Sequence, residues 1–297
     1  MADTGMRFGF GDNWNRFVRQ KHSQQRLDAA AARLTGFLKR DDLKGLDFLD
    51  IGSGSGLHSL AALKLGAEKL HSFDYDANSV AATRFLRDRA GKPDHWSVEQ
   101  GDVLDDSYVA SLGTWKLVYS WGVLHHTGEV WRALRNAQSC VAEGGLFYIA
   151  LYSKDVDFQP SQAFWLEIKQ EYNRVTSLTK WLMVWWYVWR FGMSMNIRNL
   201  PAVLKQIWTY RTQRGMNYFT DVRDWLGGWP MEYAGDQETV DLLEGEYGFE
   251  LINVATGHAC SEFLFRRTGV NGKKTKVKDM VARLTGPAGS PAAVNVA

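Results

Sequence analysis

Cysteine is scarce in this chain of 297 residues, which contains only Cys140 and Cys260. The two lie far apart and do not form a pair with the short spacing of metal ligands or redox motifs. Free thiols are typical of a reducing compartment, so we expect a cytoplasmic protein without disulfides. Histidines and carboxylates do not cluster at metal-ligand spacing either, and we expect no metal site.

Long hydrophobic runs are also lacking. No stretch approaches 18 uninterrupted apolar residues, so we expect no membrane span, and the first residues lack the apolar core of a secretory signal. The formal net charge is only +2, which argues against a protein that neutralises many phosphates, and we expect no nucleic-acid partner. Hydrophobic residues make up 45% of the chain, as in a globular protein with a substantial core.

The clearest local pattern is FLDIGSGSGLH at residues 48–58. An apolar run that contains Asp50 is followed by glycines at alternate positions, Gly52, Gly54 and Gly56. A helical pattern comes next, so the segment predicts a buried parallel strand, a tight turn and a helix. Glycines allow positive φ and the close approach of a ligand, and the helix directs its first N–H groups at the turn.

The glycine spacing separates two kinds of nucleotide ligand. A dinucleotide loop follows G-x-G-x-x-G/A, whose third small residue allows close packing of helix on strand. Counted from Gly52 that position is Leu57, and counted from Gly54 it is Ser59. A pyrophosphate loop therefore fits poorly, and an NAD-dependent oxidoreductase stays as the weaker alternative. An ordinary glycine-rich turn without a ligand is the structural alternative.

The pattern D-x-G-x-G-x-G resembles the first motif of class I S-adenosylmethionine-dependent methyltransferases. Further matches follow in order: Asp74 ends the second expected strand, residues 101–103 read G-D-V, and residues 123–126 read V-L-H-H after the fourth strand. The last match is similar to the bacterial small-molecule branch of the family. The resemblance implies S-adenosyl-L-methionine as the cofactor. It also implies a set of cofactor-binding residues: Asp50, Gly52, Ser53, Gly54, Gly56, Asp74, Tyr75, Asp102, Val103 and Trp121.

Two acids would carry the contacts to the nucleoside. Asp74 lies about 20 residues beyond the glycine loop, the offset at which an acid binds ribose hydroxyls, and Asp76 is the competing candidate. The resemblance places Asp102 on the exocyclic amine of adenine and Val103 on the ring. The alternative for Asp102 is to cap the helix that follows.

Strand-like and helical segments alternate over residues 46–151, which favours an α/β fold with a doubly wound parallel sheet. Two more strands, at residues 248–254 and 261–267, resemble the antiparallel hairpin that closes the family's mostly parallel seven-stranded sheet. The expected organisation has five parts: an N-terminal helical cap (1–45), a cofactor-binding core (46–151), a mainly helical substrate insertion (152–235), the closing helix and hairpin of the core (236–270) and a flexible tail (271–297).

The resemblance also excludes some classes of methyl acceptor. Methyltransferases of exocyclic amino groups and glutamine amides carry two prolines and an aromatic residue after the fourth strand, where residues 120–123 read SWGV. Cytosine C5 enzymes need a cysteine near that strand, and Cys140 comes too late. We expect methyl transfer to a small-molecule or lipid-like acceptor, at an oxygen atom. A non-catalytic cofactor-binding or interaction protein is the alternative from another class.

An oxygen acceptor needs alignment with the methyl group and a base. His125 and His126 are the candidate bases, because they follow a strand whose carboxyl end faces the expected cleft. Each could instead be a structural histidine held by hydrogen bonds. The candidates for contact with the acceptor come from other parts of the chain: Trp14, Asp224, Trp225, Glu232 and His258.

Acids are absent from one long stretch. From Tyr172 to Thr220 there are seven lysines and arginines and no aspartate or glutamate, and Trp181–Trp189 reads WLMVWWYVW. As a helix this segment would extend about 14 Å, too short for a bilayer core of about 30 Å. Three alternatives stay open: a core for the inserted domain, a lid over an apolar acceptor, or an interfacial helix with weak peripheral membrane contact through residues 178–191.

Overall fold

The computed structural model describes residues 8–9, 24–213, 218–257 and 259–285. The chain forms two compact units. The larger, which we call the core unit, runs from residue 9 to residue 156 and resumes at residue 232. The smaller, which we call the helical unit, consists of residues 157–231 together with Phe8.

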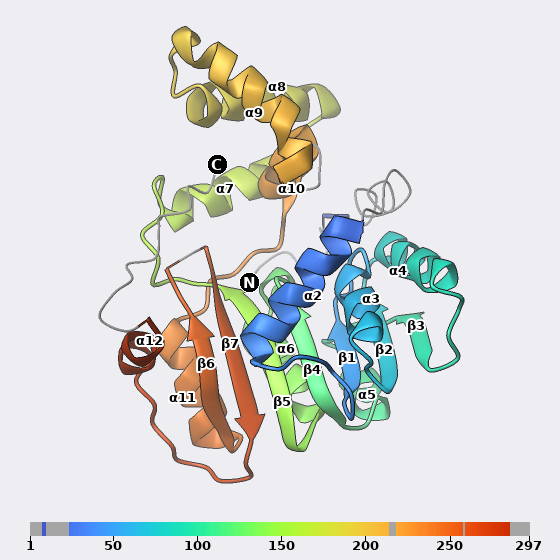
Figure 1. Cartoon of the computed structure of the whole chain (residues 1–297). Helices are drawn as coiled ribbons and strands as arrows, with labels where there is room; N and C mark the ends of the chain where they lie inside the picture. The colour runs from blue at the N-terminus through green and yellow to red at the C-terminus, as the bar shows by residue number, and fades with distance from the viewer. Residues whose placement is uncertain (1–7, 10–23, 214–217, 258, 286–297) are drawn as a thin grey trace. The chain divides into compact units, whose positions relative to one another are not determined.

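A seven-stranded sheet forms the centre of the core unit, with the strand order β3-β2-β1-β4-β5-β7-β6 (Figure 1). Its strands are β1 (Asp47–Ile51), β2 (Lys69–Asp74), β3 (Trp96–Gln100), β4 (Trp115–Trp121), β5 (Val141–Tyr152), β6 (Phe249–Ala255) and β7 (Cys260–Arg267). β1 to β5 pair in parallel, whereas β7 runs antiparallel to both β5 and β6. The predicted doubly wound, mostly parallel sheet with a closing antiparallel hairpin is confirmed.

Helices cover both faces of the sheet (Figure 1). One face carries α2 (Gln24–Leu38), α3 (Leu57–Lys64) and α4 (Ala77–Arg89), and the other carries α5 (Asp106–Ser111), α6 (Val130–Ser139), α11 (Asp236–Glu246) and α12 (Val277–Thr285). Successive residues of β5 point to opposite faces of the sheet. Tyr148 packs beneath α2, while Phe147 and Ile149 belong to the hydrophobic cluster on the other face. A strand buried on both sides needs a nearly continuous apolar run, which β5 provides.

The strand order places the predicted motifs at one edge. β1 lies between β2 and β4, and all three run in parallel, so their carboxyl ends meet. The glycine loop follows β1, Asp74 ends β2 and Trp121 ends β4. In open α/β sheets a ligand binds outside these ends, at the point where the strand order reverses. Here that point lies between β1 and β4.

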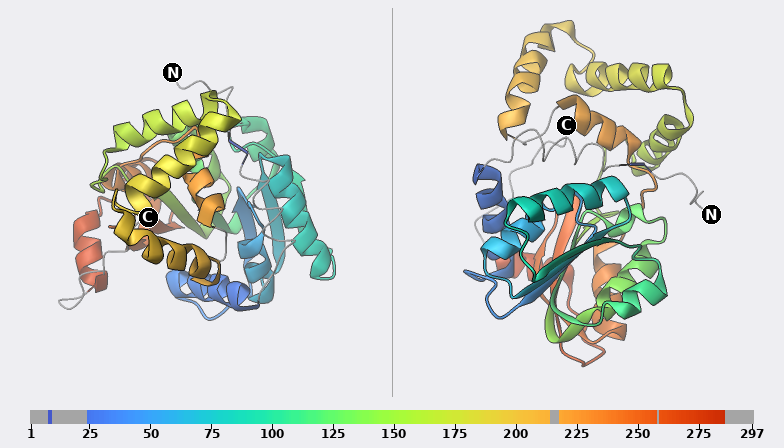
Figure 2. Two further views of the ribbon diagram at one scale, coloured as in Figure 1. Left: turned by 90° about the horizontal axis from the view of Figure 1, so that it is seen from above. Right: turned by 90° about the vertical axis from the view of Figure 1, so that its right-hand side faces the viewer.

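The helical unit has its own hydrophobic core. Its elements are α7 (Gln162–Arg174), α8 (Ser177–Tyr187), the π-helical turn η2 (Val188–Gly192), the 3-10 turn η3 (Ile197–Asn199), α9 (Leu200–Gln213) and α10 (Tyr218–Gly227) (Figure 2). Ser161 and Thr176 cap α7 and α8 by accepting from backbone N–H groups. Trp165, Tyr187 and eight further buried side chains form the core. In the described part of the chain, none of the helices combines the length and the apolar character needed to cross a membrane.

The segment after β7 differs from the expectation of a flexible tail. Residues Val277–Thr285 form α12, Val277 is buried, and Met280 and Val281 pack against the core cluster. The Glu244 carboxylate accepts from the Thr275 N–H at 2.7 Å and fixes the approach to the helix. Apolar residues at 277, 280 and 281 share one face of a helix, a short pattern that the surrounding lysines conceal in the sequence.

Candidate cofactor site

Backbone conformation and close steric contacts both require glycine in this loop. Gly52, Gly54 and Gly56 have φ values of 75°, 54° and 76°, in the left-handed region that favours glycine. A Cβ on Gly52 would lie 2.3 Å from the Val123 side chain, and one on Gly56 would lie 2.9 Å from Thr83. The loop therefore packs between α4 and the segment after β4, with its backbone in direct contact with both. Larger residues do not fit.

Asp74 joins the end of β2 to this loop. One carboxylate oxygen accepts from the Gly54 N–H at 2.9 Å and the other accepts from the Asp76 N–H at 2.9 Å. Burial raises the pKa of Asp74 to about 6, although these hydrogen bonds act in the opposite direction. A carboxylate offers about four acceptor positions, and the backbone N–H groups of Gly54, Asp76 and Tyr75 bond to Asp74, so capacity for a ligand hydroxyl remains. Asp76 instead caps α4 by accepting from the Asn78 N–H at 2.8 Å.

Asp50 lies in the core rather than at the ligand side of the loop. Its side chain is buried and accepts from the Ser59 hydroxyl of α3, which also bonds to Ser72 of β2 at 2.8 Å. Burial, with a smaller contribution from the nearby Asp74, raises the pKa of Asp50 to about 7 against the lowering effect of the Ser59 hydrogen bond. Ser53, within the loop, bonds to the Thr83 hydroxyl at 2.9 Å. These contacts give Asp50 and Ser53 the role of holding the loop against its helices.

Local hydrogen bonds shape the corner after β3. Asp102 accepts from the Leu104 N–H at 2.9 Å in a local turn, while Asp105 caps α5. Val103 is 5% exposed and belongs to the core cluster, so its side chain points into the protein. Tyr75, directly after Asp74, is 53% exposed at the same edge of the sheet.

Trp121 lies in a cluster that the sequence did not predict. The Arg33 guanidinium of α2 stands 4.6 Å from the centre of the Trp121 ring and forms an ion pair with Glu262 of β7. Glu262 also accepts from the Tyr148 hydroxyl. The three partners come from elements that are distant in sequence, and only the register that places Glu262 opposite Ala150 brings them together. The cluster fixes α2 over the end of β4.

The two histidines occupy different environments. They form the 3-10 turn η1 (Leu124–His126) after β4. His125 is fully buried, its Nδ1 accepts from the Tyr152 N–H at 3.2 Å, and its C=O accepts from the Glu232 N–H at 2.9 Å. His126 is half-buried, with its ring centre 4.5 Å from that of His125 and 6.0 Å from that of Tyr152. His125 thus matches the structural alternative, and His126 is the accessible one.

Glu232 supports the same turn. One of its carboxylate oxygens accepts from the Val130 N–H at 2.8 Å, at the start of α6, and burial raises its pKa. The Glu129 side chain, at the capping position of α6, makes no such bond. Glu232 therefore caps α6 and braces His125 through the backbone.

Asp224 and Trp225 belong to α10 of the helical unit. Buried Lys169 donates to the Trp225 C=O and lies 4.1 Å from the centre of the Trp225 ring. Burial lowers the pKa of Lys169 to about 7, and Asp224 opposes that shift. Asn173, one turn along α7, donates to the Gly227 C=O at 2.8 Å. These bonds close the end of α10 within the unit. Trp14 and His258 lie outside the described residues.

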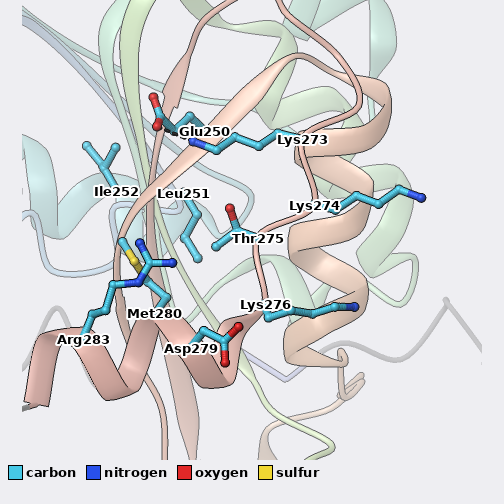
Figure 3. Close-up of a pocket in the computed structure, with 10 residues that line it drawn as sticks. All are labelled: Glu250, Leu251, Ile252, Lys273, Lys274, Thr275, Lys276, Asp279, Met280 and Arg283. Atoms are coloured by element: carbon cyan, nitrogen blue, oxygen red, sulfur yellow. Dashed lines mark hydrogen bonds and ion pairs between the residues drawn. The ribbon is translucent and has the colours of Figure 1, made fainter.

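A hollow of about 480 Å³ lies between β6 and α12 (Figure 3). Four basic side chains line it: Lys273, Lys274, Lys276 and Arg283. Lys273 pairs with Glu250, whereas Lys274 and Lys276 point away from β6. None of the predicted site residues lines this hollow. Within the described residues, no group of histidine, cysteine and carboxylate side chains could hold a metal ion.

Residues 20–220 match the family model of a methyltransferase domain, more than half of the chain. The chain belongs to this methyltransferase family. With the glycine loop and Asp74, the match shows an S-adenosylmethionine-dependent methyltransferase. The residues present fit that cofactor, because the three loop glycines hold left-handed backbone conformations and Asp74, which accepts from the Gly54 N–H, retains acceptor capacity.

Known proteins resemble the chain over limited lengths or at low identity. The ribosomal protein L11 methyltransferase of Photobacterium profundum is 37% identical over 81 residues, 26% of this chain and 28% of that protein. The chain thus spans about a quarter of the curated relatives that it matches. An O-methyltransferase family protein from Burkholderia thailandensis has a TM-score of 0.52 at 13% identity, covering 89% of this chain and 60% of that one. This likeness shows the fold alone.

Proposed function

We propose that this methyltransferase acts on a small-molecule or lipid-like acceptor, at an oxygen atom, by in-line displacement. The observation that carries the proposal is the glycine loop bound to Asp74 beside a turn that presents a half-buried histidine. When bound, S-adenosylmethionine supplies an activated sulfonium methyl group. The protein then has to align an acceptor and remove its proton.

The core unit would hold the cofactor from three sides. We propose that Asp74 accepts hydrogen bonds from the ribose hydroxyls and that Asp102 accepts one from the adenine amine. The backbone of the glycine loop would hold the methionine part, at positions where larger side chains do not fit. Trp121, held by Arg33, provides an aromatic wall at the end of β4.

His126 is our candidate for the base that takes the acceptor's proton. Its ring packs against His125 and Tyr152, which limits its rotation without burying it completely. His125 is a positioning residue in this account. Its Nδ1 accepts a hydrogen bond, so in the neutral ring the proton lies on Nε2.

The helical unit is our candidate for the substrate-binding part of the chain. It forms a separate core from residues 157–231, inserted between β5 and α11. We infer a cytoplasmic location from the two free cysteines, and no nucleic-acid partner from the net charge of +2. A lipid-like acceptor also calls for peripheral membrane contact, and residues 178–191 are the segment that we propose for it.

The acceptor class is tested by following the methyl group. The protein would be incubated with labelled S-adenosylmethionine and a bacterial extract, separated into metabolite, lipid and ribosomal-protein fractions. We expect label in the metabolite or lipid fraction, joined to oxygen by mass spectrometry, and its loss in His126→Ala. Label confined to ribosomal protein would contradict the proposal and favour the acceptor in the name of the curated relatives.

A further inference from the structure

Helix α8 has two apolar faces, of which the helical unit buries only one. Val184 and Tyr187 point into the unit's core. The opposite stripe is exposed: Leu178 by 69%, Trp181 by 53% and Trp185 by 45%. Their spacing of three and four residues follows one side of a helix. A helix that is apolar all round is normally buried, so this stripe is not explained by the fold of the unit.

Helix α9 carries a second exposed apolar stripe. Leu200, Leu204 and Trp208 recur every four residues on α9, and Trp208 is 85% exposed, while Val203 of the same helix enters the core. Among the described residues, ten of the 13 exposed large hydrophobic side chains fall within residues 178–208. We call this set the 178–208 surface. Such a concentration marks an interaction site rather than the scattered exposure of an ordinary surface.

The charge of the same segment indicates the partner. Four basic residues lie among the apolar ones: Lys180, Arg190, Arg198 and Lys205. No aspartate or glutamate occurs between residues 172 and 220. A second copy of the chain would bring the same positive charge to the contact. A small acceptor would not require a tryptophan as open as Trp208. An anionic bilayer offers apolar depth for tryptophan and leucine and negative headgroups for lysine and arginine.

We propose that the 178–208 surface binds the face of an anionic phospholipid bilayer as a peripheral contact. Tryptophans of α8 and α9 enter the interface, and the basic side chains reach the phosphates. The contact is electrostatic in part and is therefore weakened by salt. It rests on and deepens the membrane contact proposed above for residues 178–191, because it adds α9 and names the lipid class, and its test requires neither the cofactor nor any particular acceptor.

Flotation with vesicles tests this surface. The full chain would be mixed with phosphatidylcholine vesicles, with or without about one third phosphatidylglycerol, at low and high salt. We expect binding to the anionic vesicles at low salt, reduced at least about tenfold by high salt or by omission of the anionic lipid. Trp185→Ser with Trp208→Ser should weaken binding by a similar factor.

Charge variants separate electrostatic from apolar binding. Each removed basic residue should weaken binding about fivefold where it reaches the lipid, so Arg190→Gln, Arg198→Gln and Lys205→Gln together should reduce it at least tenfold. Two matched controls on the core unit should bind like wild type: the exposed apolar pair Val270→Ser with Leu284→Ser, and the exposed lysine triple Lys274→Gln, Lys276→Gln and Lys278→Gln.

Three results would overturn the proposal. The first is no flotation of wild type with anionic vesicles. The second is equal loss of binding in the surface variants and the core-unit controls. The third is a wild-type protein that does not bind vesicles and that sediments as a dimer, with the dimer dissociated by Trp185→Ser with Trp208→Ser. A second copy of the chain would then cover the surface. Affinity for S-adenosylhomocysteine, measured on every variant, checks folding and stands independently of this outcome.

Discussion

The helical unit exposes some of its tryptophans, whereas the described tryptophans of the core unit are buried or half-buried. In the core unit, Trp96 and Trp115 are nearly fully buried, and their indole N–H groups donate to Ser72 and to the Leu112 C=O at 2.9 Å each. In the helical unit, Trp181 and Trp208 are more than half exposed. Burial with a satisfied N–H is what stability alone requires. The exposed tryptophans therefore point to a requirement other than folding.

The same contrast holds for buried charge. The core unit buries Asp50 and Asp74 beneath the glycine loop, whereas the helical unit buries Lys169 against the end of α10. Burial favours the neutral form of each group, so it raises the pKa of the acids and lowers that of the lysine. The two units should consequently respond to pH in opposite directions.

The largest effect is expected from the glycine loop. Gly52→Ala would place a Cβ against Val123 in a backbone with φ of 75°, and should lower the free energy of unfolding by about 2–4 kcal/mol. Measurable binding of S-adenosylhomocysteine should also be lost. Gly113→Ala is the matched control, because its φ of 66° is similar and no atom lies within 4 Å of the new Cβ. Equal behaviour of the two variants in urea unfolding would contradict this account of the loop.

Substitutions of the two histidines should have different effects, one on turnover and the other on stability. His126→Ala should lower kcat by about 10²–10⁴-fold, the usual contribution of a general base, with little change in cofactor affinity. His125→Ala removes a buried ring that packs against Tyr152, and should lower the unfolding free energy by about 2 kcal/mol or more. Calorimetry and urea unfolding on both variants measure the difference. The assignment fails if His126→Ala retains full turnover on the identified acceptor.

The pH dependence of the core unit follows from its buried acids. The folded-state pKa of Asp50 is about 7 and that of Asp74 is about 6, both above the unfolded value. Through these two acids the folded state binds more protons between about pH 4 and 7, so they make stability fall as pH rises, by at most about 1.4 kcal/mol per pH unit and group. His58, whose pKa is lowered by burial to about 4, opposes that slope below about pH 6.5. Asp50→Asn should flatten this slope, whereas exposed Asp94→Asn should not. Urea unfolding from pH 4.5 to 7.5 decides the point.

The helical unit should show the reverse slope. The folded-state pKa of Lys169 is about 7, below its unfolded value of 10.5. Between these values the unfolded state holds more protons, so stability should rise as pH rises from about 7 to 10. Asp224 limits the shift, and the rise in stability should not exceed about 1.4 kcal/mol per pH unit. Lys169→Met should abolish the rise, and exposed Lys205→Gln should preserve it. An unchanged slope in Lys169→Met would show that another group causes it.

The elements of the core unit were predictable because each has a strong local signal. The second strand ends at Asp74 as predicted, and the closing strands predicted at residues 248–254 and 261–267 correspond to Phe249–Ala255 and Cys260–Arg267. The order of the strands follows from the handedness and shortness of their connections. Only the segment of α12 was missed, because its three apolar residues lie in a basic context.

Side-chain direction was less accessible from the sequence. The predicted roles of Asp50 and Val103 assumed that they face the ligand, and both point into the core. A shift of one residue along a strand reverses the face of a side chain, and only tertiary packing fixes that choice. The same holds for Arg33, Tyr148 and Glu262, whose contact depends on strand register and on the position of α2. In α8, apolar residues on both faces concealed which face is buried.

Calorimetry of the cofactor site tests the central claim most directly. Wild type should bind S-adenosylhomocysteine and not NAD. Asp74→Ala should weaken that binding by about 1.5–3 kcal/mol, or roughly 10–150-fold, because hydrogen bonds to a charged group are the stronger kind. Asp76→Ala, which removes the cap of α4, should lower stability by about 1 kcal/mol and leave affinity nearly unchanged. Wild-type affinity for S-adenosylhomocysteine in Asp74→Ala, or preferential binding of NAD by wild type, would contradict the assignment of this site.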